Sequence, residues 1–403
     1  MKVLFVAPRL NGDGVGEVRK SFELLQALIP LAEVTVLALE NRIARPLKQQ
    51  LTECEVITFQ EPIWTRWRGR LASMLKPEII AFNGCVRRWY RQSGRQFDIA
   101  HQILPAGARY PSALRGLGLP YVIGPVGGSL STPEAFKKEM ESEAWFTRFR
   151  ALDTVRLRYD PWLRASYRNA DLVLGVAPYM RETLSDLPIR RFEPFLRLGV
   201  HALAPARPRT YVPGELKLLH VGRAVRTKGL RESIRALAEL PDLPKVTLTC
   251  VGDGEELPFC KAEAQRLGVA DRVFFVGKQP RERVEDFYRD CDALLFPSFR
   301  ESMGGVLYEA MNWGMPIITV RRGGPDWIVD ETCGLKVPVT TPERMPKDLA
   351  TAIRTLAEDP ELCQRLGQNG RDHLEREALW SSKAQKLVSL YEEVLAARAA
   401  EKA

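Results

Sequence analysis

Short apolar runs alternate along this chain with segments of helical periodicity, and that alternation constrains its fold more than any other feature. Nine of the runs have the length and composition of buried strands, and they cover residues 2–7, 33–38, 121–123, 172–176, 217–221, 246–251, 273–276, 293–296 and 316–320. When a helix lies between two successive strands, the strands join one parallel sheet with helices on both faces. The pattern therefore predicts an α/β protein with doubly wound parallel sheets.

The chain is long enough for two such domains. It has 403 residues, and chains beyond about 250–300 residues usually split into separate cores. The prolines and arginines of ALAPARPRTYVP interrupt the alternation and predict a linker over residues 206–215. The linker separates an N-terminal domain (1–205) from a C-terminal domain (216–378). The tail 379–403 is rich in Ala, Glu, Lys and Leu, which favours one last helix.

The sequence has the features of a cytoplasmic protein. No apolar run reaches the roughly 18 residues that a transmembrane helix needs, and we interpret the opening MKVLFVAPRL as a first strand and not as a secretory signal. The cysteines lack C-x-x-C spacing, which favours reduced thiols and argues against structural zinc. They are seven in number: Cys54, Cys85, Cys250, Cys260, Cys291, Cys333 and Cys363.

Positive charge is concentrated in the N-terminal half. Residues 1–210 hold 31 Lys and Arg against 20 Asp and Glu, whereas residues 211–403 hold 28 against 30. Aromatic residues lie among these cations at 64–70, 87–91 and 145–150. Such clusters suit an anionic membrane surface, an acidic acceptor or nucleic acid. The alternative is a solvated face whose aromatic rings turn inward.

Two carboxylates with seven residues between them bracket a glycine pair in the second half. Glu301 precedes Gly304 and Gly305, and Glu309 follows them on a helix predicted from about Met303. The amides at a helix start attract anions, and glycines allow a phosphate to come close. Carboxylates accept hydrogen bonds from vicinal hydroxyls. The segment therefore predicts a site for a diphosphate with a ribose at one end and a sugar at the other.

A second turn supplies positive charge. The strand at 217–221 runs into Gly222 and Arg223, and Arg226 and Lys228 follow just before a helix. Cations at a strand-to-helix turn are what a diphosphate requires where no metal neutralises it. We therefore expect a metal-independent anion site.

The glycine loops do not fit a nicotinamide enzyme. A dinucleotide fingerprint needs a third glycine three residues after the second. In the loop at 252–255 that position holds Leu257, and in the loop at 12–16 it holds Glu17 or Arg19. No dinucleotide cofactor is expected.

The segment around Glu301 and Glu309 resembles the E-x7-E signature of retaining glycosyltransferases of family 4. The likeness extends over roughly 217–340 and includes Arg223 and Lys228, which match the family's GR…KG element. It implies a GT-B fold, with two Rossmann-like domains facing a central cleft and the last helix crossing back to the first domain. The implied reaction moves a hexose from a UDP- or GDP-sugar to a hydroxyl, with retention, in polysaccharide, glycolipid or glycoconjugate biosynthesis.

The resemblance also implies roles for individual residues. The catalytic set would be Arg223, Lys228 and Glu301. The donor-binding set would be Glu309, Gly252, Gly254, Gly277, Lys278, Met303, Gly304, Gly305 and Val306, and the acceptor or cleft set would be Gly14, Gly16, His101, Gly127 and Gly128. The implied partners are a nucleotide-sugar and a sugar or lipid-linked acceptor at an anionic membrane surface, and not nucleic acid. The implied location is the cytoplasm, with peripheral association at the inner face of the plasma membrane.

Three features depart from the family pattern or compete with it. Ser302 and Met303 stand where the family more often has Gly and an aromatic, which changes the sugar end of the pocket. The family's usual histidine after the strand at 121–123 is replaced by GPVGGS, and His101 is equally well explained as a structural histidine. The D-x-D of Asp290 and Asp292 precedes a strand, where solvent-facing Asp is ordinary, so we do not interpret it as a metal site.

Two other functions fit the same residues. A nucleotide-sugar epimerase can share this fold and would convert the donor without an acceptor. A non-catalytic binding protein would keep the nucleotide pocket alone, although the intact Glu301, Glu309, Arg223 and Lys228 argue against such decay.

Overall fold

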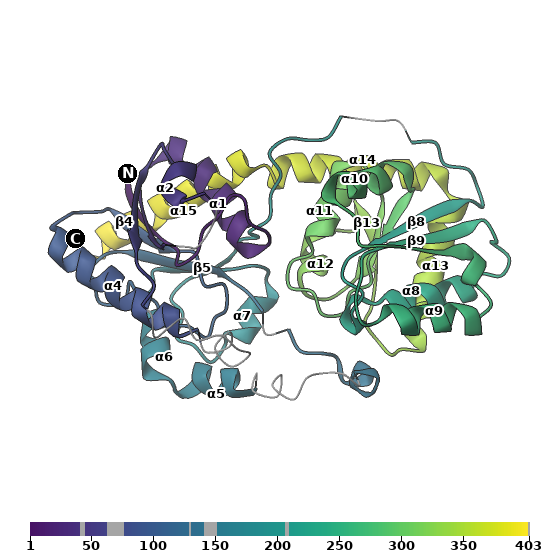
Figure 1. The fold of residues 1–403 in the computed structure, drawn as a ribbon, viewed down its shortest axis with the longest axis horizontal. Helices are drawn as coiled ribbons and strands as arrows, with labels where there is room; N and C mark the ends of the chain where they lie inside the picture. Colours follow the sequence, from purple (N-terminus) through teal and green to yellow (C-terminus); the bar gives the residue numbers. More distant parts are fainter. Residues whose placement is uncertain (41–44, 63–75, 129, 141–150, 206–208, 402–403) are drawn as a thin grey trace. The chain divides into compact units, whose positions relative to one another are not determined.

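The structure is a computed structural model that describes residues 1–40, 45–62, 76–128, 130–140, 151–205 and 209–401 (Figure 1). The chain divides into two compact units. Unit 1 contains Met1–Ser129, Trp145–Gly199 and Trp380–Ala403, and unit 2 contains Leu130–Ala144 and Val200–Leu379. The division differs from the sequence prediction in two segments, because 130–140 and 200–205, both predicted in the N-terminal domain, group with the C-terminal sheet.

Seven parallel strands form the sheet of unit 1, in the order β3-β2-β1-β4-β5-β6-β7. The strands are β1 (Lys2–Val6), β2 (Glu33–Leu39), β3 (Glu55–Phe59), β4 (Ile99–Gln102), β5 (Tyr121–Val126), β6 (Leu172–Gly175) and β7 (Phe192–Pro194). The helices are α1 (Glu17–Leu28), α2 (Leu47–Gln50), α4 (Pro77–Ser93), α5 (Ala151–Tyr159), α6 (Pro161–Arg168), α7 (Tyr179–Thr183) and α15 (Trp380–Ala400), with a 3-10 turn η1 (Ile29–Leu31).

Six parallel strands form the sheet of unit 2, in the order β10-β9-β8-β11-β12-β13. The strands are β8 (Leu216–Val221), β9 (Val246–Val251), β10 (Val273–Gly277), β11 (Ala293–Leu295), β12 (Ile317–Val320) and β13 (Gly334–Val337). The helices are α8 (Leu230–Ala238), α9 (Leu257–Arg266), α10 (Arg281–Asp290), α11 (Gly305–Asn312), α12 (Gly323–Ile328), α13 (Arg344–Glu358) and α14 (Pro360–Glu377), with 3-10 turns η3 (Glu134–Glu139), η5 (Arg226–Lys228) and η6 (Ala270–Arg272).

Both sheets confirm the doubly wound α/β prediction. The nine predicted runs leave out β4, an inner strand that carries the polar residues His101 and Gln102, and also β3, β7 and β13, each of which is an edge strand of its sheet. An edge strand is covered less completely than a central one, so its residues need not form a continuous apolar run. Their side chains are largely half-buried, whereas those of the central strand β5 are all buried.

The part of the predicted linker that the structure describes is hydrogen-bonded to unit 2. Residues 206–208 lie outside the described residues. Arg209, which follows them, donates hydrogen bonds to the backbone oxygens of Tyr288 at 2.5 Å and Trp313 at 3.2 Å. The described part of the linker is therefore fixed to unit 2 from Arg209 onward.

The last helix completes the core of unit 1. Buried side chains of α15 pack with the apolar residues of the unit 1 sheet and α1; they are Trp380, Leu387, Leu390, Tyr391 and Val394. The Trp380 ring lies so close to Gly199 that a Cβ there would approach it to 2.6 Å. In the described part of the chain, no helix has the length and apolar character needed to cross a bilayer.

His101 on β4 is an interior residue. Its side chain is fully buried, with Nε2 lying 2.7 Å from the Gly124 carbonyl oxygen and Nδ1 lying 2.5 Å from the Tyr391 hydroxyl. Because a carbonyl only accepts, Nε2 carries the proton and Nδ1 accepts from Tyr391. Burial lowers the pKa of His101 to about 4. Both ring nitrogens are thus occupied inside unit 1, and we leave His101 out of the proposed site.

The depressed pKa of His101 predicts acid sensitivity. In the unfolded chain a histidine takes up a proton near pH 6.5, whereas folded His101 stays neutral down to about pH 4, so acid favours the unfolded state. Between these pH values the histidine should remove about 3 kcal/mol from the free energy of unfolding. Urea unfolding of wild type and His101→Gln at pH 7 and pH 4.5 measures this, with exposed His201→Gln as the control. Equal pH dependence in His101→Gln and wild type would contradict the prediction.

Candidate functional site

The candidate site lies where the strand order of unit 2 reverses. From β8 the chain moves outward to β9 and β10 and then returns to β11 on the other side of β8 (Figure 1). In open parallel sheets, ligands bind beyond the carboxyl ends of the strands at this kind of reversal. The loops after β8, β9 and β11 carry most of the predicted donor-binding residues.

Glycines let the loops after β8 and β9 touch through their backbones. Gly252 has φ 140°, and a Cβ there would lie 1.8 Å from the Gly222 oxygen. A Cβ on Gly254 would lie 2.3 Å from the Ala224 oxygen. The Ala224 amide donates to the Asp253 oxygen at 3.0 Å, which ties the two loops together. Any side chain at these glycines would push the loops apart.

Lys228 and Glu301 form an ion pair between the turns after β8 and β11. Both side chains are mostly buried, at 17% and 16% exposure. The Lys228 ammonium also lies 5.3 Å from the centre of the Phe296 ring. Gly229, which follows Lys228, comes so close to Pro297 that a Cβ would lie 2.2 Å from its oxygen. The structure therefore joins in one place the cation and the carboxylate that the sequence predicted separately.

The loop that carries Glu301 leads into the start of α11. The second oxygen of Glu301 accepts a hydrogen bond from the Met303 amide at 3.2 Å. Gly304 has φ 90°, a left-handed conformation that favours glycine, and α11 begins at Gly305 with no side-chain cap. The Leu307 amide donates to the Gly304 oxygen at 3.0 Å, whereas the amides of Gly305 and Val306, at the first two positions of the helix, have no carbonyl within the helix to bond and suit an anion.

Glu309 lies one turn into α11, and its side chain is exposed. Its Oε2 accepts a hydrogen bond from the Tyr288 hydroxyl on α10 at 2.8 Å. Burial, together with the Glu309 charge, raises the pKa of Tyr288 well above its usual value, so the tyrosine stays a donor. The contact orients one edge of the carboxylate toward α10.

Arg223 and Arg226, which lie at or close to η5, differ in exposure and in ion pairing. Arg223 is exposed, and no ion pair to it is found among the described residues. Arg226 is only 5% exposed, and its guanidinium pairs with Glu232 and Glu139. The sequence prediction counted Arg226 with the phosphate-binding cations, and the structure corrects this, because its charge is already neutralised inside unit 2.

The loop after β10 adjoins the same edge of the sheet. Gly277 has φ 71°, and its oxygen accepts a hydrogen bond from the Gly252 amide at 2.9 Å. The next residue, Lys278, has an exposed side chain. Gly277, a member of the predicted donor-binding set, is thus bonded directly to the glycine turn after β9.

The predicted acceptor residues other than His101 lie on loops of unit 1. Gly16 has φ 67° and is the N-cap of α1, and the Gly14 amide closes a turn on the Asn11 oxygen at 3.2 Å. The Gly127 amide donates to the Ala106 oxygen at 2.7 Å, and the Gly128 oxygen accepts from a tyrosine hydroxyl at 3.2 Å. These glycines are ordered parts of turns.

The D-x-D pair does not converge on one point. Asp290 pairs with Arg289 at 3.0 Å, while Asp292 accepts the Lys217 amide at 2.8 Å. Among the described residues, no group of three or more His, Cys, Asp or Glu is placed to hold a metal ion.

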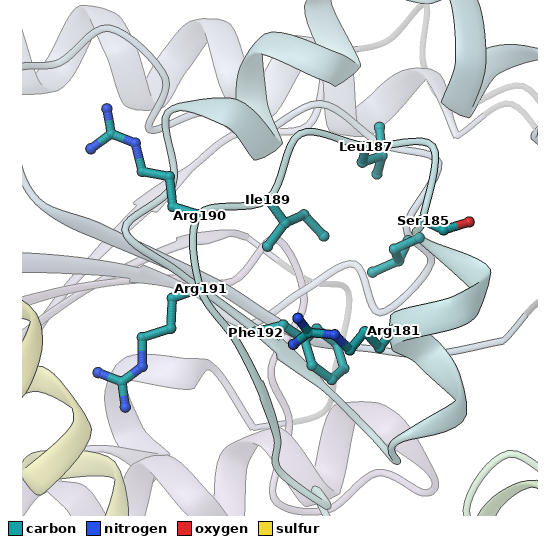
Figure 2. Close-up of a pocket in the computed structure, with 8 residues that line it drawn as sticks. Arg181, Ser185, Leu187, Ile189, Arg190, Arg191 and Phe192 are labelled. Carbon is teal, nitrogen blue, oxygen red and sulfur yellow. The ribbon is translucent and has the colours of Figure 1, made fainter.

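A pocket of about 420 Å³ in unit 1 involves none of the predicted residues (Figure 2). Its lining runs from α7 to the start of β7 and comprises Arg181, Leu184, Ser185, Leu187, Ile189, Arg190, Arg191 and Phe192. Arg191 is paired with Glu193 and with Glu393, the latter at 2.6 Å. The pocket lies at the amino end of β7, away from the carboxyl edge where ligands of parallel sheets bind.

The aromatic and basic clusters of the N-terminal half are only partly described. Residues 64–70 and 145–150 lie outside the described residues. In the cluster at 87–91, the Trp89 and Tyr90 rings each lie 6.4 Å from the Phe97 ring, and Arg87 donates to the Ala113 oxygen at 3.0 Å. In this cluster the aromatic rings pack against the protein, as expected for a solvated basic face whose rings turn inward.

The amino-acid sequence is similar to those of known proteins. A family model described as glycosyl transferases group 1 matches residues 208–373. The lipopolysaccharide core biosynthesis glycosyltransferase LpsE of Rhizobium meliloti is 32% identical over 244 residues, or 58% of this chain and 69% of LpsE. A D-inositol 3-phosphate glycosyltransferase of Corynebacterium jeikeium is 32% identical over 346 residues, or 81% of this chain and 80% of that protein. The chain belongs to the glycosyl transferases group 1 family.

Solved structures extend the likeness of this group 1 glycosyltransferase to both units. Sucrose-phosphate synthase of Thermosynechococcus elongatus aligns with a TM-score of 0.67 and 21% identity, over 98% of this chain and 100% of that one. HepE of Anabaena, solved in complex with UDP-glucose, aligns with a TM-score of 0.60 and 19% identity, over 96% of this chain and 99% of that one. The two-domain GT-B fold is confirmed.

Proposed function

We propose that this group 1 glycosyltransferase is a retaining enzyme of family 4 that transfers a hexose from a UDP- or GDP-sugar to a hydroxyl without a metal ion. The observation that carries the proposal is the Lys228–Glu301 pair at the strand reversal of unit 2. A mostly buried cation beside glycine turns and a free helix start suits a diphosphate. The binding of UDP-glucose by HepE supports a nucleotide-sugar donor.

The proposed roles follow from where the side chains lie. Lys228 and Arg223 neutralise the diphosphate as the bond from the sugar's anomeric carbon to the phosphate oxygen breaks. Glu301 binds a sugar hydroxyl, and Glu309 accepts hydrogen bonds from the ribose. The acceptor oxygen bonds to the anomeric carbon on the face that the diphosphate leaves, and its proton passes to the departing phosphate. Preorganised charge at the leaving group is the main source of rate enhancement in this scheme.

We further propose that the acceptor is lipid-linked, and that unit 1 meets it at an anionic membrane surface on the cytoplasmic side. Tyr159 and Trp162 are 67% and 65% exposed, and Arg158 and Arg115 lie 5.6 and 5.8 Å from the respective rings. Exposed aromatics beside cations suit a lipid interface. The role of LpsE in lipopolysaccharide core biosynthesis is consistent with such an acceptor.

Product analysis separates the transferase from the epimerase. We expect a UDP- or GDP-sugar to stay unchanged in its sugar configuration when incubated with the protein alone. Sugar transfer is expected when extracted glycolipids or polysaccharide are added. Nuclear magnetic resonance of the donor and the product measures both. Conversion of the donor to an epimer without any acceptor would support the alternative function.

Co-sedimentation tests the membrane proposal. We expect the protein to sediment with vesicles containing phosphatidylglycerol at low salt, and less so at high salt because the attraction is screened. The double variant Tyr159→Ser, Trp162→Ser should sediment less, whereas Phe259→Ser, which removes an exposed aromatic of unit 2, should sediment as wild type. Absence of wild-type sedimentation at low salt would contradict the proposal.

A further inference from the structure

The segment 130–140, here called the strap, is part of unit 2 although it lies within the N-terminal half of the sequence. It follows Gly127 and Gly128, which lie in unit 1, and precedes α5, which also lies in unit 1. The eleven residues of the strap therefore belong to unit 2, although the described segments before and after them in the sequence belong to unit 1.

The strap is anchored by an aromatic side chain in the core of unit 2. Phe136 is fully buried and stacks on Phe299, with ring centres 4.3 Å apart and an interplanar angle of 30°. The Arg226 guanidinium lies 5.6 Å from the Phe136 ring centre and 5.3 Å from that of Phe299. Phe136 therefore contacts both the loop before Glu301 and the turn before Lys228.

Glu139, the last residue of η3, forms ion pairs with unit 2. Glu139 pairs with Arg226 and, at 3.3 Å, with Arg235 on α8. Burial opposes ionisation of Glu139, but hydrogen bonds and charge from Arg226 and Arg235 prevail and lower its pKa. Glu139 and Glu232 together hold Arg226 from two sides.

The first residues of the strap contact the loops around Glu301. The Thr132 hydroxyl accepts a hydrogen bond from Arg300 at 3.0 Å, and the Ser131 oxygen accepts one from Arg322 at 2.9 Å. Leu130 lies against Gly323, where a Cβ would come within 2.8 Å of the Leu130 side chain and 2.4 Å of the Glu301 oxygen. The strap thus contacts the immediate neighbours of Glu301 as well as those of Lys228.

We propose that Phe136 and Glu139 are positioning residues for donor binding, acting through the strap's hold on the two turns that carry Lys228 and Glu301. Arg226 and Lys228 belong to the same 3-10 turn, so fixing the guanidinium fixes the backbone that carries the ammonium. This inference rests on the proposed function.

Titration calorimetry with UDP or GDP tests the proposal, together with steady-state kinetics for the corresponding sugar donor. We expect Glu139→Gln and Phe136→Ala to raise the nucleotide Kd and the donor KM about tenfold, roughly the effect of losing one charged hydrogen bond, with a smaller change in kcat. Glu139→Asp should recover part of the loss. Glu134→Gln, on the exposed face of η3, is the matched control and should behave as wild type.

Hydrogen exchange of the peptide containing residues 223–229 provides a second readout that does not depend on a donor. We expect faster exchange there in Glu139→Gln and Phe136→Ala than in wild type and Glu134→Gln. Unchanged exchange and unchanged nucleotide affinity in both variants would overturn the role of the strap. Failure of wild type to bind any nucleotide would instead contradict the proposed function. The two failures are distinguishable, because hydrogen exchange tests the strap without a nucleotide.

Discussion

Lys228→Ala is expected to lower kcat/KM for the sugar donor by two to three orders of magnitude, about 10²–10³, the usual effect of removing one preorganised group that stabilises charge in the transition state. The ammonium is mostly buried next to Phe296 and is the one charged partner of Glu301 among the described residues. Its removal takes away charge that the departing diphosphate needs. Initial-rate kinetics measure the effect, with exposed Lys347→Ala on α13 as the control.

Glu301→Gln distinguishes the role of the carboxylate from that of Lys228 when nucleotide affinity and turnover of the sugar donor are both measured. In the absence of donor the carboxylate neutralises Lys228, so the diphosphate and Glu301 compete for one ammonium. The variant is therefore expected to bind free UDP or GDP at least as tightly as wild type and to turn over the sugar donor more slowly. A fall of less than tenfold in kcat/KM for Lys228→Ala would contradict the role given to that residue.

Arg226→Met is expected to cost about 3–5 kcal/mol of the free energy of unfolding, which is typical when one member of a buried ion pair is removed. Glu232 has no exposed surface and would lose the guanidinium that both of its oxygens contact. Urea unfolding measures the loss. The double variant Arg226→Met, Glu232→Leu removes both charges and should recover most of the stability. A loss below about 1 kcal/mol in the single variant would contradict the prediction and show that Arg235, which lies 3.6 Å from Glu232, compensates the carboxylate by itself.

The sheets were predictable because parallel strands covered on both faces must be apolar throughout. The loop after β11 was also predictable, since glycines next to carboxylates at a helix start point to an anion site wherever they occur. Edge strands such as β3 and β13 were not, because partial exposure removes the continuous apolar run.

The roles of individual charged residues were less predictable. Arg226 and Lys228 are two residues apart in the same turn, yet one is buried against Glu232 and the other pairs with Glu301. Glu139, the second partner of Arg226, lies 87 residues earlier in the chain. A contact over that distance leaves no periodicity in the sequence, so the strap could only be found in three dimensions.

For His101 the sequence left two interpretations open, a cleft residue and a structural histidine. A polar residue in a central strand has the same sequence signature whether it faces a ligand or packs inside. Here β4 lies between β1 and β5, and the imidazole is satisfied by Gly124 and Tyr391.

The central claim is that the carboxyl edge of the unit 2 sheet binds a nucleoside diphosphate through Lys228 without a metal ion. Titration calorimetry of wild type and Lys228→Ala with UDP and GDP, each in excess EDTA, tests it most directly. We predict that wild type binds one molecule of one of these nucleotides in EDTA and that Lys228→Ala binds it at least tenfold more weakly. Binding that disappears in EDTA and returns with added divalent metal, or equal affinity in the two proteins, would contradict the claim.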